Sequence, residues 1–290
     1  MLLHHKANVK QRILAQLYKI EADLLADDNH HAWTNLGLWQ VSQQDYVSAA
    51  KQLTLKMGQA LNLSVQDHLL DVGCGYGASL HLWHQQFGLD HITALELQPI
   101  CCRFIERKKL AYVQHIVQQS IFDPKPKQLN TRYDVIVSVD ATYHYALQDY
   151  LKVLEDWLKP DGRIGFHLLM RLNPTDAVSV DAQQALKHKL KWAKIDFDQV
   201  LHQDEIYSVL QQHGYDHIQI EDLSQGVLNG FYQFVMQKKW SLQQKINLGY
   251  AKIYATARLC KYLVESKQCA YIQVTAQKSN TPSKAYHSSV

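Results

Sequence analysis

One short glycine-rich segment constrains the fold of this chain more than any other feature. Residues 71–77 are Asp-Val-Gly-Cys-Gly-Tyr-Gly, and they connect the apolar run Leu69–Val72 to a helical pattern over residues 78–87. Glycine lets the backbone turn sharply and approach a ligand closely, and the following helix offers free N–H groups to an anion. A glycine-rich turn between a strand and a helix is therefore typical of a nucleotide-type binding site.

Strand and helix patterns alternate after this turn. Apolar runs predict strands at residues 92–96, 115–117, 133–139, 163–169, 218–223 and 270–275. Apolar spacing of three and four predicts helices at residues 99–111, 147–158 and 204–213, the last ending at Gly214, with a turn at 159–162. This alternation predicts an α/β fold whose βαβ units form a Rossmann-like, mostly parallel sheet.

Additional helical patterns flank the predicted sheet. They cover residues 7–26, 44–61 and 240–264, and a mixed helical insertion covers residues 171–200. We expect an N-terminal helical cap (1–65), a nucleotide-binding core (66–170), a part that completes the sheet with helical insertions forming the acceptor pocket (171–276) and a flexible polar tail (277–290).

The composition argues against several classes of protein. The 290 residues include 30 Lys and Arg against 27 Asp and Glu, so the net charge of +3 gives no case for nucleic acid. No apolar run reaches the ~18 residues that span a bilayer, and the first residues lack the apolar core of a signal peptide. Five irregularly spaced cysteines favour a reducing cytoplasm. The histidine pairs 4–5 and 30–31 do not share a helix face, and we predict no metal site.

A carboxylate at the end of the next strand supports the nucleotide-type site. Glu96 is the last residue of the strand at 92–96, where it can accept hydrogen bonds from both hydroxyls of a ribose. Asp71 can balance an ammonium group or organise the loop. A nicotinamide dehydrogenase is the main rival, but its fingerprint needs a third glycine at the position of Ala78.

These segments resemble the class I S-adenosylmethionine-dependent methyltransferases. The resemblance rests on Leu70–Gly77, which is similar to motif I of that family, and on residues 96–99, 133–136 and 158–162. It points to the small-molecule and lipid group, with the sterol, quinone, cyclopropane-fatty-acid and glycine/sarcosine methyltransferases. The resemblance implies a seven-stranded sheet whose last strand is antiparallel, with S-adenosylmethionine as cofactor and S-adenosylhomocysteine as product.

The same resemblance implies which residues contact the cofactor. The motif I backbone would hold the methionine part, Glu96 the ribose, and Leu97 the region near the adenine. The family often has an acidic residue after the third strand, where this chain has Ser120. The complete predicted cofactor set is Asp71, Gly73, Cys74, Gly75, Gly77, Glu96, Leu97, Gln98, Ser120, Ile121 and Asp140.

The segment after the fourth strand is the predicted catalytic edge, because ligands bind at the carboxyl ends of strands in open α/β sheets. His144 is a candidate general base, and Tyr143 can orient the acceptor or face the sulfonium. His144 can alternatively cap the next helix. The candidate acceptor-binding residues are Tyr145 and, in the cap, Trp39 and Tyr46. Aromatic residues of this kind can alternatively pack in the hydrophobic core.

Two other functions stay open at this point. A non-catalytic S-adenosylmethionine-binding protein would keep motif I without an open acceptor pocket, and an NAD(P)-dependent oxidoreductase would bind a different cofactor. The acceptor, the methylated atom and the choice between monomer and homodimer are not determined by the sequence.

Overall fold

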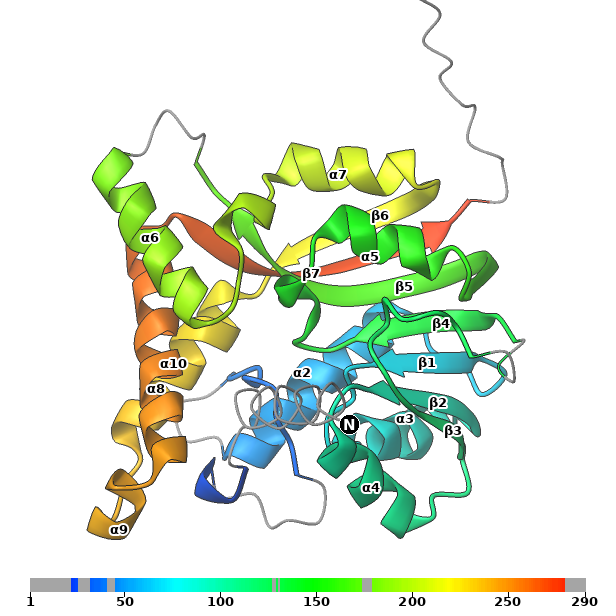
Figure 1. The fold of residues 1–290 in the computed structure, drawn as a ribbon, viewed down its shortest axis with the longest axis horizontal. Helices are drawn as coiled ribbons and strands as arrows, with labels where there is room; N and C mark the ends of the chain where they lie inside the picture. Colours follow the sequence, from blue (N-terminus) through cyan, green and yellow to red (C-terminus); the bar gives the residue numbers. More distant parts are fainter. Residues whose placement is uncertain are drawn as a thin grey trace, which may run out of the picture.

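The centre of the molecule is a seven-stranded sheet. The computed structural model describes residues 22–25, 32–40, 45–126, 129, 131–173 and 179–279. The strands lie in the order β3-β2-β1-β4-β5-β7-β6 (Figure 1). Neighbouring strands are parallel except where β7 pairs with β5 and β6. The predicted Rossmann-like sheet with an antiparallel last strand is therefore confirmed.

The elements follow the predicted alternation. The strands are β1 His68–Val72, β2 His91–Glu96, β3 Val113–Gln118, β4 Tyr133–Ser138, β5 Leu158–Arg171, β6 Tyr215–Asp222 and β7 Cys269–Lys278. The α-helices are α2 Tyr46–Ala60, α3 Ala78–Phe87, α4 Pro99–Lys108, α5 Leu147–Leu154, α6 Val180–Trp192, α7 Gln203–Gln212, α8 Gly230–Gln237, α9 Leu242–Lys245 and α10 Leu248–Ser266. The short turns are η1 Ala22–Leu25, η2 Thr142–His144, η4 Phe197–Gln199 and η5 Gln225–Asn229.

Both faces of the sheet are buried. Leu69 of β1 joins a core with α2, α3, α8 and α10, whereas its neighbour Leu70 joins a second core with α5 and α7. Successive side chains of a strand point to opposite faces, so a strand covered on both faces needs a continuous apolar run. This is why the central strands are mostly apolar in the sequence.

Glycines follow the ends of two helices, and the one at Gly214 was predicted. Gly88 follows α3 with φ +70°, and Gly214 follows α7 with φ +71°. Residues without a Cβ adopt this left-handed conformation at little cost, which makes glycine the common residue just after a helix.

Two predicted elements differ from the structure, and one helix was missed. The turn at 159–162 lies inside the bounds of β5 as a bulge, because the pairing with β4 passes from Leu158 directly to Arg163. The single helix at 240–264 is two helices, since Asn247 caps α10 through Gly249 N–H at 2.7 Å. Helix α8, with the π-helical turn η5, was not predicted. The helix expected at 7–26 lies outside the described residues except for η1.

Two glycines explain how α8 and η5 pack. A Cβ added at Gly226 would lie 2.6 Å from Leu38, and one at Gly230 would lie 2.6 Å from the Trp39 ring. The N-terminal segment 32–40 therefore packs directly on this helix. Among the described residues, no helix is both long enough and apolar enough to cross a bilayer.

This packing predicts that Gly230→Ala lowers the stability of the protein. Alanine favours a helix over glycine by about 1 kcal/mol, but overpacking against Trp39 costs about 1–3 kcal/mol. Because an added Cβ would lie within 2.6 Å of the Trp39 ring, the cost should fall in the upper part of this range, and we expect a net loss of up to about 2 kcal/mol in urea unfolding. Exposed Gln233→Ala on the same helix is the control and should change stability by a few tenths of a kcal/mol at most. A Gly230→Ala protein as stable as wild type would contradict the packing argument.

Candidate functional site

The glycine-rich turn leaves β1 and enters α3 in a conformation that needs glycine. Gly73, Gly75 and Gly77 have φ angles of +74°, +56° and +81°. A Cβ at Gly73 would lie 3.1 Å from Ala141, and one at Gly75 would lie 2.9 Å from Thr34 Oγ1. The turn thus lies against both the end of β4 and the N-terminal segment.

Asp71 supports this turn through hydrogen bonds to α3. Its carboxylate is fully buried and accepts hydrogen bonds from Ser79 Oγ at 2.6 Å and Trp83 Nε1 at 2.8 Å. Burial raises the pKa of Asp71 to about 6. Both donors belong to α3, so Asp71 ties that helix to β1; contact with a ligand's ammonium group stays a prediction. Cys74 is buried beside it, and burial raises the pKa of its thiol, which keeps the thiol protonated.

Glu96 lies at the end of β2 and points to the glycine-rich turn. Its carboxylate accepts hydrogen bonds from Gly75 N–H at 2.9 Å and from Gln98 N–H at 2.8 Å. Burial raises the pKa of Glu96, while these N–H donors favour the charged form. Each carboxylate oxygen still has a lone pair for another donor.

The other predicted cofactor residues differ in exposure and in hydrogen-bond partners. Leu97 is about half exposed, at 47%, and Ile121 is buried at 1% exposure. Ser120 is engaged in its own turn, because its hydroxyl accepts a hydrogen bond from Phe122 N–H at 3.2 Å. The Gln98 side-chain oxygen is buried and has no hydrogen-bond partner among the described residues. Their contacts with a cofactor stay predictions.

Asp140 connects four separate segments at the end of β4. Its carboxylate accepts hydrogen bonds from Leu36 N–H at 2.7 Å and from the Tyr271 hydroxyl at 2.7 Å. Its own N–H donates to His167 Nδ1 at 3.1 Å, and Tyr143 also hydrogen bonds to its side chain. Burial raises the pKa of Asp140 to about 6.

The backbone at Asp140 is unusual. Asp140 has φ +57°, a left-handed conformation that non-glycine residues adopt with strain. His167 is fully buried, and burial lowers its pKa to about 3, so the ring is neutral and its Nδ1 accepts. Asp140 was predicted as a cofactor contact from its place after β4, whereas His167 and Tyr271 were not predicted, because their approach depends on β5 and β7 lying beside each other.

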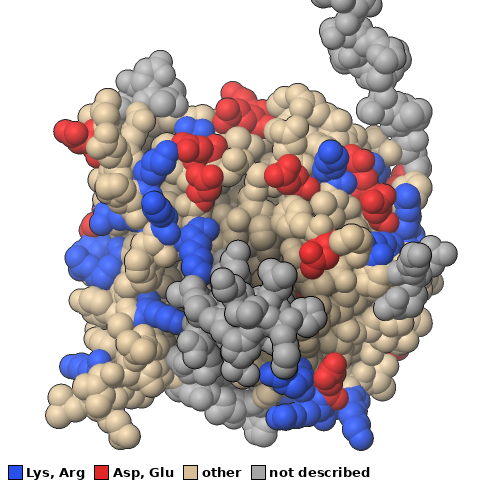
Figure 2. All heavy atoms as spheres, viewed as in Figure 1, with Lys and Arg blue, Asp and Glu red and all other residues tan. Residues whose placement is uncertain are grey.

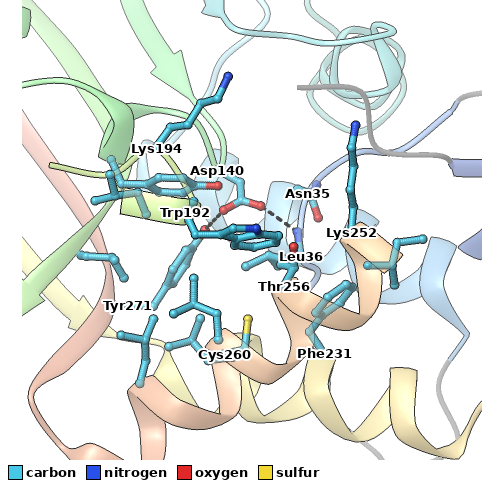
Figure 3. A pocket seen from close by; sticks show the side chains of 18 of the residues that line it. Asn35, Leu36, Asp140, Trp192, Lys194, Phe231, Lys252, Thr256, Cys260 and Tyr271 are labelled. Carbon is cyan, nitrogen blue, oxygen red and sulfur yellow. Dashed lines mark hydrogen bonds between the residues drawn. The ribbon is translucent and has the colours of Figure 1, made fainter. Parts of the chain in front are cut away.

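An apolar cavity of about 320 Å³ opens beside Asp140. Figure 3 shows Asp140 and Tyr271 on one side and Phe231, Thr256 and Cys260 on another. Most of its wall is apolar and comes from α8, α10, β5 and the segment after α6. Two lysines, Lys194 and Lys252, also line it. The wall residues from α8, α10 and the segment after α6 were not predicted individually, because which of their side chains face the cavity is a tertiary property.

His144 and Tyr143 line the same cavity. His144 Nδ1 lies 3.3 Å from the carbonyl oxygen of Lys194, so Nδ1 donates and Nε2 keeps its lone pair. Burial lowers the pKa of His144, which keeps the ring neutral near pH 7. The alternative that His144 caps the next helix is not what the structure shows, because Ala146 is the N-cap residue of α5. Burial raises the pKa of Tyr143.

The three aromatic residues predicted to bind the acceptor lie in different places. Tyr46 lines the cavity and donates from its hydroxyl to the Asn35 carbonyl at 2.8 Å. Trp39 stacks on Phe234 with the ring centroids 4.5 Å apart, outside the cavity lining. Tyr145 also lies outside it, where its ring packs edge-on against Phe122.

The described residues contain no group of three or more His, Cys, Asp or Glu side chains that could hold a metal ion. The two adjacent histidine pairs, at 4–5 and 30–31, lie outside the described residues.

The chain and its fold have relatives among known proteins. The family model described as mycolic acid cyclopropane synthetase matches residues 37–255. The chain belongs to that family. The family and the seven-stranded fold confirm the predicted resemblance to class I methyltransferases of the small-molecule and lipid type.

Two curated relatives each match about half of this chain. A glycine/sarcosine/dimethylglycine N-methyltransferase from Actinopolyspora halophila is 28% identical over 147 residues, which is 47% of this chain and 25% of that protein. An erythromycin 3''-O-methyltransferase from Saccharopolyspora erythraea is 28% identical over 152 residues, which is 50% of this chain and 49% of that protein. The chain therefore spans half or less of the length of these relatives.

A solved structure covers more of the chain. The geranyl diphosphate C-methyltransferase from Streptomyces coelicolor, solved with Mg²⁺, geranyl diphosphate and S-adenosylhomocysteine, superposes with a TM-score of 0.64. The superposition covers 92% of this chain and 97% of that chain at 17% sequence identity, which establishes the shared fold. These three relatives are named for N-, O- and C-methylation, so similarity alone does not select the methylated atom.

The raised pKa of Asp140 predicts a pH-dependent stability. The folded-state pKa of Asp140, about 6, lies above its ordinary 3.8, so protonation favours the folded state. Stability from this group is present below pH 3.8 and is lost as the pH rises to about 6. Relative to wild type, Asp140→Asn should gain about 3 kcal/mol of unfolding free energy between pH 4 and pH 8.

Urea unfolding at a series of pH values measures this difference. Asp149→Asn, on the exposed side of α5, is the control and should show no such gain. A stability difference between Asp140→Asn and wild type that stays constant with pH would contradict the argument.

Proposed function

We propose that this protein transfers the methyl group of S-adenosylmethionine to a small, partly apolar acceptor. The observation that carries the proposal is the position of the apolar cavity. Asn35 lines both this cavity and the recess at Gly73 and Cys74, and Asp140 and Ala141 join the cavity wall to the glycine-rich turn. A cofactor held by that turn would therefore face the cavity.

The residues at the turn fit S-adenosylmethionine. The left-handed glycines leave the backbone open where a Cβ would intrude, and Glu96 keeps acceptor capacity for two ribose hydroxyls. The Gln98 side-chain oxygen, buried without a described partner, adds an acceptor beside Glu96. When bound, the cofactor supplies a methyl group already activated by the sulfonium.

The chain's own residues would position the acceptor and remove water. The apolar wall from α8 and α10 excludes water and holds the acceptor in line, and such positioning accounts for much of the rate in a reaction of this kind. His144 is neutral, and its Nε2 can take a proton from an acceptor O–H or N–H. Asp140 and the hydroxyl of Tyr143 supply polar contacts at the same end of the cavity.

The two other functions are less well supported. A binding protein without catalysis would fill the space above the cofactor with side chains, whereas the described residues enclose a cavity of about 320 Å³. An oxidoreductase of the dinucleotide type needs a third glycine where Ala78 begins α3. We further propose the cytoplasm as the location of the protein.

Replacing Glu96 tests the cofactor site. Glu96→Gln puts an amide N–H₂ in place of one of the two oxygens that accept from Gly75 N–H and Gln98 N–H, and it removes the charged acceptor for the ribose. Adenosylhomocysteine affinity, measured by isothermal titration calorimetry, should fall at least about tenfold, which corresponds to about 1.4 kcal/mol. Exposed Glu106→Gln on α4 is the control and should bind as wild type does. Wild-type protein that binds NAD and not adenosylhomocysteine would overturn the proposal.

Replacing His144 tests the catalytic end. With methyl-labelled S-adenosylmethionine and a small-molecule extract, wild-type protein should move label into a product that partitions into organic solvent. His144→Asn should lower this rate by about 10²-fold or more while adenosylhomocysteine affinity stays within about twofold. Unchanged turnover would remove His144 from the chemistry and leave positioning as the source of rate.

A further inference from the structure

The end of the molecule that carries α9 exposes an unusual set of aliphatic side chains. Leu242, Ile246 and Leu248 are 83%, 85% and 83% exposed. The next most exposed large apolar residues among those described are Val180 at 69% and Val65 at 60%, far apart in sequence. Single exposed apolar residues are ordinary, but three such residues within seven positions form a local patch that calls for a partner.

This patch is held in a defined conformation. Ser241 and Gln244 form a capping box at α9, with their side-chain to backbone hydrogen bonds at 3.2 and 3.0 Å. Trp240 anchors the approach to α9, because its ring nitrogen donates to the Val235 carbonyl at 3.0 Å. Asn247 starts α10 immediately afterwards. The three aliphatic side chains are therefore presented to solvent by a structured tip, which we define as residues 241–248.

The charged residues near this tip in the sequence are all basic. Residues 223–264 contain no Asp or Glu, and their basic residues are Lys238, Lys239, Lys245, Lys252, Arg258 and Lys261. Lys239 and Lys245 are exposed beside the aliphatic side chains. On the face shown in Figure 2, the end of the molecule that carries α9 shows neutral and basic atoms and no acidic ones.

The combination of exposed aliphatic and basic side chains fits one kind of surface. Aliphatic side chains insert at the boundary between headgroups and acyl chains, and lysines near them are attracted to anionic headgroups. A second copy of this chain would bring the same basic residues together and repel. Charge complementarity therefore favours an anionic lipid bilayer as the partner.

The tip is also connected to the cavity. Leu248 is the first residue of α10, and Gly249, Lys252 and Ile253 of the same helix line the cavity. Four residues of helix advance about 6 Å, so Lys252 lies one turn beyond Leu248. Figure 1 places α9 at the outer end of α10, on the side of the molecule away from β3 and β4.

We propose that residues 241–248 form a membrane-docking tip, in which Leu242, Ile246 and Leu248 insert into an anionic lipid surface and Lys239 and Lys245 contact its phosphate groups. The protein attaches to one leaflet without crossing it. Docking through this tip brings the helix that lines the cavity next to the lipid, which gives an apolar ligand a short path from the bilayer.

Vesicle co-sedimentation tests the tip without cofactor or acceptor, so the result does not depend on methyltransferase activity. The full chain should bind vesicles of phosphatidylcholine with phosphatidylglycerol and bind pure phosphatidylcholine at least about fivefold more weakly. Leu242→Ser combined with Ile246→Ser and Leu248→Ser should lower the bound fraction at least about tenfold. Lys239→Glu with Lys245→Glu should lower it at least about fivefold and keep the wild-type thermal unfolding.

A matched control removes exposed apolar residues elsewhere. Val65→Ser with Val180→Ser should bind vesicles as wild type does, since both residues lie outside the tip. The proposal is overturned if wild-type protein does not bind anionic vesicles, or if the triple serine variant binds them equally well. Light scattering that shows wild-type dimers, serine-variant monomers and no vesicle binding would assign the patch to a second copy of the chain instead.

Discussion

The structure depends on one partly buried carboxylate, that of Asp140, at the end of a strand. Asp140 joins β4 to the N-terminal segment through Leu36 N–H, to β7 through the Tyr271 hydroxyl and to β5 through His167. These hydrogen bonds decide where the N-terminal cover and the cavity wall meet the glycine-rich turn. Without them, the sheet would still form from its apolar strands, but the cavity beside it would lose a fixed edge.

This arrangement costs stability, and the cost is concentrated where the chemistry is proposed. Asp71 is fully buried, Asp140 is partly buried, and both have raised pKa values; Asp140 also has a strained backbone. A buried carboxylate persists only where the surroundings supply hydrogen bonds, and strained residues cluster at functional sites. The cores on the two faces of the sheet supply the stability that tolerates this.

The meeting of the glycine-rich turn with Glu96 was predictable because its signals are local. Glycines at three alternate positions and a carboxylate at the end of the next strand belong to one βαβ unit, so their meeting follows from strand pairing alone. The cavity side was predictable only in part. His144 and Tyr143 were found because they follow β4 directly, whereas His167, Tyr271 and the lining of α10 come from elements more than 20 residues away.

The sequence by itself determined the strand and helix alternation, the parallel core and the glycine-rich turn, since each depends on residues within one or two elements. Tertiary structure alone decided that Asp140 is a hub, that Tyr145 and Trp39 lie outside the cavity, and that one amphipathic pattern at 240–264 is two helices with an exposed tip. The physical reason is that apolar periodicity specifies which face of an element is buried but not what is packed against it. That choice is made when segments distant in the chain satisfy each other's polar groups and fill each other's volume.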